Sequence, residues 1–358
     1  MRRRMSSCVG ASPSSLRKRG ELMANPTPLQ KAWLARLRPE LPRYFPHAHG
    51  SLDLRVAGPP DLRTHSRLFP FTVLADGLPL AEILVKIPQG RKAANVNLAF
   101  RAYRLLNRHL ADDPHLAAPS ALGVWSDPPA LIMEKADGDA LFVWMKECRN
   151  WAIETGCQLA QNFVKQAGRW LARLHHLPPP DWASPAPHAM ELLDGWLNRL
   201  RGFGLDPLEE KRIRDQTRIL AAPPESPSVP LHGDFTLRNV LCRLPQDVTI
   251  LDTELAQFGD PAADIGWFLA ALHAIDKWQI LGGEMIYTRA VIQRTGDAFL
   301  QGYASVRPLP PREVIQAYKV ARLTERWLEF VEREQQRNIA GLRTLIIRRI
   351  NQHFARAV

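Results

Sequence analysis

Three side chains in one region of the chain have the types and the spacing that phosphoryl transfer requires. Asp234 and Asn239 stand five positions apart, and Asp252 follows thirteen positions later. In phosphoryl transfer an Asp orients the attacking hydroxyl group and accepts its proton, while an amide and a second carboxylate hold Mg²⁺ on the nucleotide phosphates. The order and spacing therefore predict Asp234 as the catalytic base and Asn239 and Asp252 as the magnesium ligands.

The residues between Asn239 and Asp252 predict a β-hairpin that would position these two side chains. An apolar run at 240–243 is followed by a turn sequence at 244–247 and a β-branched run at 248–251. Such a hairpin returns the chain to its start, so both side chains would reach one ion, and Mg²⁺ suits oxygen ligands of this kind. The alternative is a turn in which Asp234 caps a helix and the polar residues face solvent. The second Asp and the hairpin favour catalysis.

The same region resembles a known family. His232-Gly233-Asp234 with Asn239, then Asp252-Thr253-Glu254, then the Gly-Asp-Pro-Ala-Ala-Asp sequence at 259–264, is similar to the aminoglycoside phosphotransferase family. This branch of the protein-kinase-like superfamily includes small-molecule kinases for sugars, choline and similar alcohols. The motifs lie within about residues 229–270, and weaker likeness runs from about residue 50 to the C-terminus. The resemblance implies that His232 braces the catalytic loop and that Asp260 and Asp264 are structural.

The resemblance also implies a fold and a division of the chain. We expect an α+β, two-lobed protein-kinase-like fold with a small β-rich N-terminal lobe and a larger, mainly helical C-terminal lobe. Residues 29–135 would form the nucleotide-binding lobe and residues 136–358 the catalytic and substrate-binding lobe. Residues 1–28 form a basic segment that we expect to be disordered, because it is Ser-rich and lacks periodicity. It could instead be a transit peptide or a nucleic-acid-binding tail, and Met23 could be the true start.

In the first lobe, we expect a helix at 28–41 and strands at 51–56, 68–74 and 80–87, with a turn at 75–77 joining the last two. Lys86 lies near the end of the third strand, where the resemblance implies a contact with the ATP phosphates. The alternative is an exposed lysine at a strand end. Residues 131–135 resemble the strand and hinge between the lobes, which implies that the backbone of Met133, Glu134 and Lys135 binds the adenine of ATP.

Two features of the first lobe depart from the family. The helix expected at 95–110 contains no Glu to pair with Lys86, and Arg101 or Ala102 stands at the corresponding place. Lys86 is then held by another group, or the ion pair is absent. The segment at 57–67, which would cover the phosphates, has a single Gly and two prolines, which remove backbone donors. Arg63 or Arg67 could supply charge there, although both could simply be solvated.

The second lobe is expected to be helical at 158–177, 190–201, 265–273 and 312–354. The first of these helices ends in His175 and His176. Adjacent residues point apart on a helix and no third ligand is near, so we expect a role at the helix C-terminus rather than a metal site.

The predicted activity is transfer of the ATP γ-phosphoryl group, with Mg²⁺, to a hydroxyl of a small molecule such as a sugar, an alcohol or an aminoglycoside. Acidic and basic residues are interleaved in the last helix, so no acidic field favours a polycationic aminoglycoside. The alternative is a kinase-like scaffold that binds a nucleotide or a protein partner without turnover. Nucleic-acid binding has only the net charge of +11 to support it, of which residues 1–24 contribute +5.

The rest of the composition suggests a cytoplasmic enzyme. No apolar run has the length of a membrane span, so we expect no membrane partner. The four cysteines are scattered without a Cys-x-x-Cys pair, which is typical of a reducing compartment and argues against a disulfide framework or a zinc site. The sequence predicts no oligomeric state.

Overall fold

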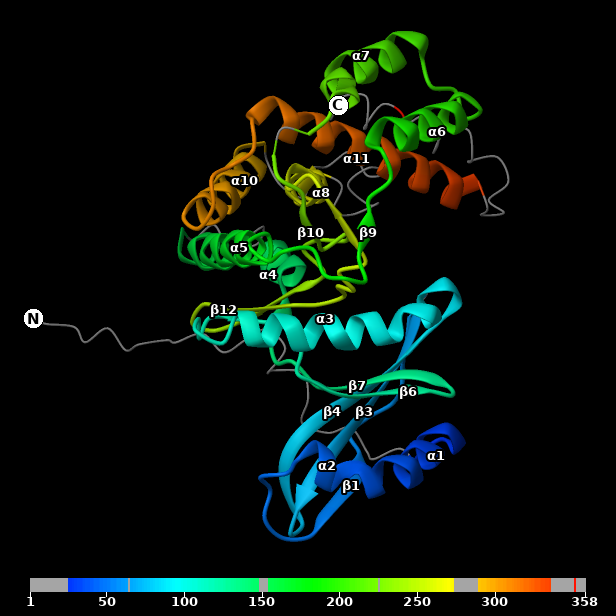
Figure 1. Ribbon diagram of the computed structural model, residues 1–358, viewed down its shortest axis with the longest axis vertical. Helices are drawn as coiled ribbons and strands as arrows, with labels where there is room; N and C mark the ends of the chain where they lie inside the picture. The colour runs from blue at the N-terminus through cyan, green and yellow to red at the C-terminus, as the bar shows by residue number, and fades with distance from the viewer. Residues whose placement is uncertain are drawn as a thin grey trace, which may run out of the picture. The chain divides into compact units, whose positions relative to one another are not determined.

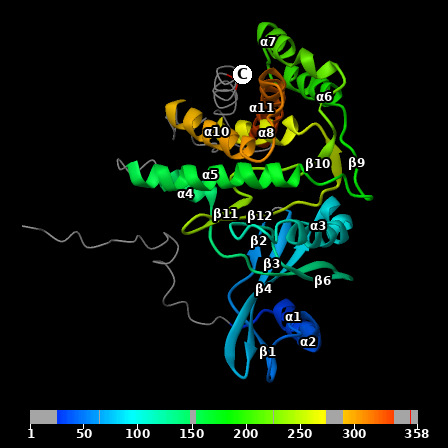
Figure 2. The ribbon, with the colours of Figure 1, turned by 60° about the vertical axis from the view of Figure 1, so that its left-hand side comes forward.

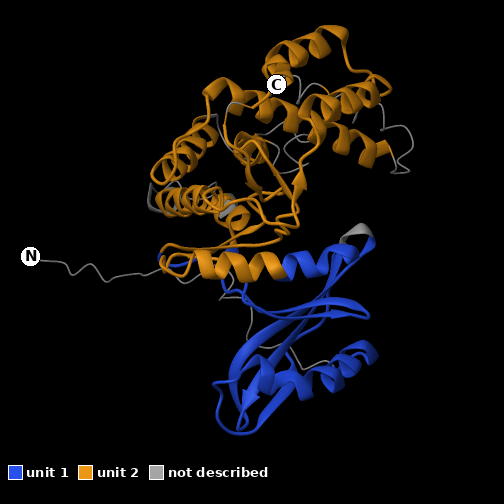
Figure 3. Ribbon diagram, viewed as in Figure 1, with its two compact units in different colours: residues 1–100, 119–139, 243–245 blue, residues 101–118, 140–242, 246–358 orange. Residues whose placement is uncertain are grey.

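The computed structural model describes residues 25–63, 65–147, 154–224, 226–273, 289–335 and 351. The chain divides into two compact units (Figure 3): unit 1 comprises residues 1–100, 119–139 and 243–245, and unit 2 comprises residues 101–118, 140–242 and 246–358. Residues 1–24 of the basic segment and most of the expected helix beyond residue 335 lie outside the described residues.

Unit 1 is built on an antiparallel sheet in the order β1-β3-β4-β7-β6, with β2 paired to β3. The β3–β4 hairpin turns at Asp76 and Gly77, whose φ angles of 48° and 80° suit a tight two-residue turn. The strands of unit 1 are β1 Leu52–Val56, β2 Asp61–Leu62, β3 Ser66–Ala75, β4 Leu78–Pro88, β6 Ala121–Ser126 and β7 Pro129–Glu134.

Two helices pack against this sheet, α1 Pro28–Leu37 and α2 Leu41–Tyr44, with the 3₁₀ turn η1 Arg38–Glu40 between them (Figures 1 and 2). Thr27 begins α1 with a capping box, because its hydroxyl accepts the Gln30 N–H and the Gln30 side chain accepts the Thr27 N–H. Trp33 and Leu37 are buried among the sheet residues Phe71 and Ile83, which makes this face the core of the unit.

Unit 2 is mainly helical. Its helix α5 packs on α10, and α8 packs on α11 (Figure 2). Glycines allow these close approaches, since a Cβ at Gly168 would lie 2.1 Å from the Phe299 carbonyl oxygen and one at Gly302 would lie 2.0 Å from that of Lys165. The helices are α4 Leu141–Glu147, α5 Glu154–Leu174, α6 Ala189–Arg201, α7 Pro207–Thr217, α8 Ala262–His273, α10 Arg289–Ala304 and α11 Arg312–Gln335, with the 3₁₀ turn η3 Arg218–Ala221.

Helix α3 Val96–His109 begins in unit 1, after the 3₁₀ turn η2 Gly90–Asn95, and continues into unit 2. Short strands form two further sheets, β10-β13-β9 and β5-β12-β11-β8, whose residues belong to unit 2 except for Asp139 of β8 and Arg243 of β11. Their bounds are β5 Leu116–Ala117, β8 Asp139–Ala140, β9 Ser184–Pro185, β10 Val229–Leu231, β11 Val240–Arg243, β12 Asp247–Ile250 and β13 Gln257–Gly259.

The β-rich unit 1 and the mainly helical unit 2 confirm the α+β class expected from the sequence. Helix α7 is an element that the sequence analysis missed, although Asp206 caps it and Pro207 opens it. Among the described residues, the structure has no helix with both the length and the apolarity to cross a membrane.

Candidate active site

Asp234 and Asn239 contact each other directly in the loop at 232–239, which we call the catalytic loop and which joins β10 to β11. The Asn239 amide nitrogen donates to the Asp234 backbone carbonyl at 2.9 Å and to its carboxylate Oδ2 at 3.0 Å. Both partners are oxygens that can only accept a hydrogen bond, so the atom that faces them must be the amide nitrogen. The Asn239 oxygen Oδ1 is thereby left on the other side of the amide, where it can serve as a ligand.

The expected hairpin is present and brings Asn239 and Asp252 to the same end. The Leu251 N–H donates to the Asn239 carbonyl oxygen at 2.8 Å, between β11 and β12. Asp252 follows with a φ of 60°, a left-handed conformation that costs energy for any residue other than Gly. Such strain is often found at functional sites, where the surroundings hold the residue in place.

Tyr103 of α3 provides part of that support. Its buried hydroxyl accepts the Asp252 N–H at 2.9 Å. Burial, together with the nearby Asp252 carboxylate, raises the pKa of Tyr103, so the phenol stays neutral. Tyr103 was not predicted from the sequence, because a Tyr on the apolar side of a helix is typical of a core residue. Its position beside Ala102, where the family's Glu was sought, was the available signal.

Asp264, in the first turn of α8, holds the start of the catalytic loop. Its carboxylate accepts the backbone N–H of His232 at 2.7 Å and that of Gly233 at 3.0 Å. His175 Nε2 donates to the same carboxylate at 3.3 Å, and His175 Nδ1 accepts from the Tyr303 hydroxyl at 2.9 Å. The role of a helix-end cap expected for His175 is wrong, because its ring is buried inside unit 2 and braces Asp264.

The His232 ring links both sides of the site. Its Nδ1 accepts the Asp234 N–H at 3.2 Å, which leaves Nε2 to donate to the Leu251 carbonyl oxygen at 3.0 Å. Burial lowers the pKa of both His232 and His175, so each is neutral. Burial alone would raise the pKa of Asp264, but the hydrogen bonds that its carboxylate accepts from the His175 ring and from the Gly233 N–H hold it below its usual range.

The residues that the sequence assigned to nucleotide binding lie in unit 1. Lys86 is half-buried in β4, opposite Leu68 of β3 and Leu131 of β7. Two backbone donors of the expected hinge are already used, since the Glu134 N–H donates to Ser120 O at 2.8 Å and the Lys135 N–H to Glu82 O at 2.9 Å. The Lys135 ammonium group also pairs with the Glu82 carboxylate. Met133 is buried at the end of β7.

At the two departures from the family, Arg101 and Arg63 form ion pairs of their own. Ala102 is buried in α3, while the Arg101 guanidinium pairs with Asp181 at 2.9 Å and stacks on the Trp182 ring at 4.0 Å. Arg63 pairs with Asp61 at 2.8 Å, and both side chains are about half exposed. Arg101 therefore does not take the place of the missing Glu, and Arg63 is already paired within its own segment.

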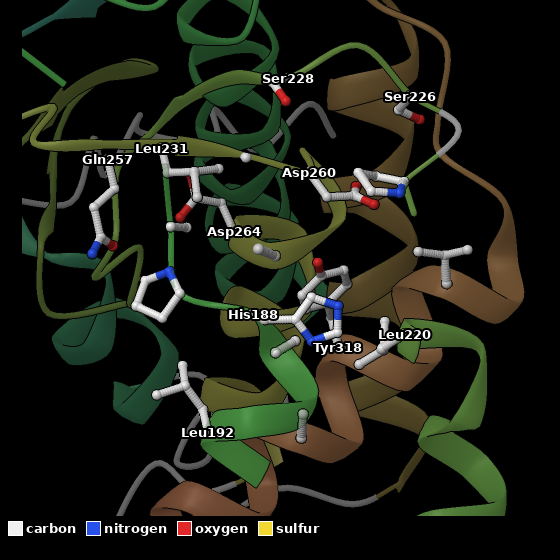
Figure 4. Close-up of a pocket in the computed structure, with 18 of the residues that line it drawn as sticks. His188, Leu192, Leu220, Ser226, Ser228, Leu231, Gln257, Asp260, Asp264 and Tyr318 are labelled. Carbon is white, nitrogen blue, oxygen red and sulfur yellow. The ribbon is translucent and has the colours of Figure 1, made fainter. Parts of the chain in front are cut away.

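Two cavities border the catalytic loop within unit 2. The smaller, of about 200 Å³, is lined by Asp234 and Asn239 and, across from them, by residues of α8 and α11. The larger, of about 320 Å³, is lined by Gly233 and by Asp260, Asp264 and Tyr318 with many apolar side chains (Figure 4). The smaller cavity is the candidate acceptor site, because the larger is lined by neither Asp234 nor Asn239.

Metal binding at this site would rely on few protein ligands. In the described part of the chain, His, Cys, Asp and Glu form no cluster of three or more that could hold a metal ion. Mg²⁺ needs no such cluster, since it is commonly bound through one or two carboxylates with waters and substrate phosphates. The Asp252 carboxylate and the Asn239 Oδ1 at one end of the hairpin fit that description.

Comparison with known proteins identifies the family. The model of the APH phosphotransferase enzyme family matches residues 70–309, so the chain belongs to that family. Family membership identifies it as a phosphotransferase, as its motifs predicted. A search of curated proteins found no match.

Three solved structures share the fold at low identity. They are a macrolide 2'-phosphotransferase from Brachybacterium faecium (18% identity, 90% of this chain and 98% of the other covered, TM-score 0.52), a choline/ethanolamine kinase family protein from Mesorhizobium loti (15%, 90% and 92%, 0.54), and a spectinomycin phosphotransferase in complex with ADP and spectinomycin (14%, 91% and 95%, 0.54). The two-lobed, protein-kinase-like fold is thereby confirmed.

Proposed function

We propose that the protein transfers the γ-phosphoryl group of ATP to a hydroxyl group of a small molecule. The observation that carries this proposal is the contact between Asp234 and Asn239, joined to Asp252 through the Leu251 to Asn239 hydrogen bond. The proposed base Asp234 and the proposed metal ligand Asn239 line one cavity, and the hairpin brings Asp252 to the same end as Asn239. The ADP in the related spectinomycin phosphotransferase supports ATP as the donor.

In this reaction the acceptor hydroxyl lies against the Asp234 carboxylate, which takes its proton as the oxygen attacks the γ-phosphorus. The bond from that phosphorus to the bridging oxygen of ADP breaks as the bond to the acceptor oxygen forms. Asn239 and Asp252 would hold Mg²⁺, which neutralises charge on the phosphate oxygens when bound. Positioning of this kind supplies most of the acceleration in phosphoryl transfer.

Unit 1 would bind the nucleotide. We propose that Lys86 contacts the ATP phosphates and that Met133, Glu134 and Lys135 lie along the adenine edge. Because the N–H groups of Glu134 and Lys135 already donate within unit 1, adenine would have to use other backbone groups of this stretch.

The test is an ADP-release assay with Mg-ATP against sugars, amino alcohols and aminoglycosides, with the phosphorylated product detected by mass spectrometry. Asp234→Asn is the appropriate blank, because an amide oxygen at position 234 can still accept from Asn239 and keep it oriented. We expect at least one class of acceptor to stimulate ADP release in the wild type and none to do so in the variant.

A kinase-like scaffold without turnover is the second candidate. It is favoured by α3, where Arg101 or Ala102 stands in place of the family's Glu and Arg101 pairs with Asp181. If no acceptor stimulates ADP release and Asp234→Asn binds ATP as the wild type does, the scaffold replaces the enzyme.

A further inference from the structure

The cavity that contains Asp234 carries more positive than negative side chains. Its negative residues are Asp234 and Glu325, and its positive residues are Arg238, Arg322 and Arg326. A site for a polycationic acceptor needs the opposite balance, because like charges repel in a confined space of low dielectric.

The three arginines differ in how far their charge is already neutralised. Arg322 of α11 lies 3.5 Å from the centre of the Trp267 ring and pairs with Glu325 at 2.6 Å. Arg326 pairs with Glu329 at 2.5 Å. Both of these cations are satisfied within α11, and their planar groups form one wall of the cavity.

Arg238 is the cation whose charge remains available. It is exposed in the catalytic loop, next to Asn239, and its guanidinium lies 4.2 Å from the centre of the Phe142 ring of α4. No carboxylate in the described parts of the chain forms an ion pair with it. The Phe142 ring does not neutralise the guanidinium, and no residue in the described part of the chain accepts a hydrogen bond from it, so its N–H groups can donate to a planar oxyanion.

We propose that the acceptor is a compact hydroxyl compound that carries an oxyanion, a carboxylate or a phosphate, and that Arg238 binds this group while the hydroxyl meets Asp234. This proposal rests on the proposed phosphotransferase function and names its substrate class. The cavity volume of about 200 Å³ is below the roughly 300–1,000 Å³ of sites for drug-sized ligands, which favours an acceptor of monosaccharide size.

The first experiment compares acceptors of equal size and different charge. Full-length protein with Mg-ATP is assayed against glucose, gluconate, glucose 6-phosphate and glucosamine, and against glycerol, glycerate and glycerol phosphate. We expect the anionic members to have the higher kcat/KM, by about tenfold or more, which is the effect of one charge-assisted hydrogen bond. A preference for carboxylate over phosphate or the reverse identifies the oxyanion. Equal or better turnover of the neutral or amino compounds overturns the proposal.

The second experiment changes Arg238. Arg238→Ala should raise KM for the anionic acceptor by about tenfold or more while KM for ATP and the melting temperature stay unchanged, and Arg238→Lys should recover part of the loss. Arg294→Ala is the matched control, since Arg294 is an exposed arginine of α10 whose Nε donates to the Ala290 carbonyl oxygen of the same helix. An equal rise in KM for every acceptor, charged or neutral, would show that Arg238 does not recognise the acceptor's negative charge.

Failure of the proposed function is distinguishable from failure of this inference. If no acceptor is phosphorylated, binding of gluconate and inorganic phosphate is measured by calorimetry with wild type and Arg238→Ala. Binding that Arg238→Ala weakens supports the anion site in a protein without turnover. Binding that is absent, or equal in the two proteins, overturns the inference.

Discussion

At Asp252 the backbone conformation and the side chain serve different purposes, and a single substitution separates them. The φ of 60° is unfavourable for Asp but allowed for Gly, so Asp252→Gly removes the carboxylate without a steric cost. We expect this variant to fold and to lose Mg-ATP turnover by about 10²–10³-fold or more.

Asp76→Gly is the matched control for Asp252→Gly, because Asp76 also has a positive φ but lies in the β3–β4 turn. Turnover is measured by ADP release and stability by urea unfolding for both variants. Turnover in Asp252→Gly equal to that of Asp76→Gly would contradict the metal-ligand assignment.

The Tyr103 hydroxyl should matter for turnover as well as for stability. Tyr103→Phe leaves the Asp252 N–H without its acceptor, which costs about 1–3 kcal/mol in a buried site and releases Asp252 from its position. Tyr44→Phe removes a comparable acceptor, that of the Trp125 indole N–H at 3.1 Å, in unit 1. We expect both variants to lose stability and Tyr103→Phe alone to lose kcat; equal kcat values would refute a positioning role.

Stability should fall as the pH is lowered. Burial holds the pKa of His175 and His232 below that of the unfolded chain, so the unfolded state binds more protons from about pH 7 downward. The lowered pKa of Asp264 adds a second loss, below about pH 4. The free energy of unfolding in urea, measured from pH 8 to 5.5, should therefore decrease, and an increase would mean that the buried rings are charged.

At the scale of the elements, close helix crossings determine which glycines can be replaced. Gly302→Ala should destabilise the protein by about 1–3 kcal/mol, because the added methyl group meets the Lys165 backbone of α5 and neither helix can yield cheaply. Gly195→Ala, inside α6 with open space around it, should stabilise by about 0.5–1 kcal/mol. Thermal unfolding of both variants decides this, and a shift of the same sign in both would contradict the packing argument.

The elements also show what periodicity can and cannot predict. The β11–β12 hairpin follows from two β-branched or apolar runs around a turn, and its pairing is local, so the sequence was sufficient. Helix α7 lacks an obvious apolar face, with only Ile213 and Thr217 buried, and its sequence signals were the Asp206 cap and Pro207 at its first position. His175 was misread because its partners Asp264 and Tyr303 are far away in the sequence.

For the whole molecule, the positions of the motif residues could be predicted from the sequence, but the residues that hold them in place could not. Asp234, Asn239 and Asp252 lie within one stretch, and the structure brings them together as their spacing suggests. Tyr103 comes from α3, and the cavity residues Trp267 and Arg322 come from α8 and α11. Contacts between residues so far apart in the chain cannot be predicted from a single sequence. The two compact units likewise consist of interleaved segments rather than of two halves of the chain.

Helix α3 has a consequence for the order in which the protein is made. Residues 96–100 of this helix belong to unit 1 and residues 101–109 to unit 2, and the last strand of the unit 1 sheet ends at Glu134. N-terminal segments leave the ribosome first, so the sheet that carries Lys86 can be complete before Asp234 is synthesised. Tyr103 would then already lie on a formed helix when Asp252 is synthesised. The proposed catalytic residues Asp234, Asn239 and Asp252 would therefore be brought together last.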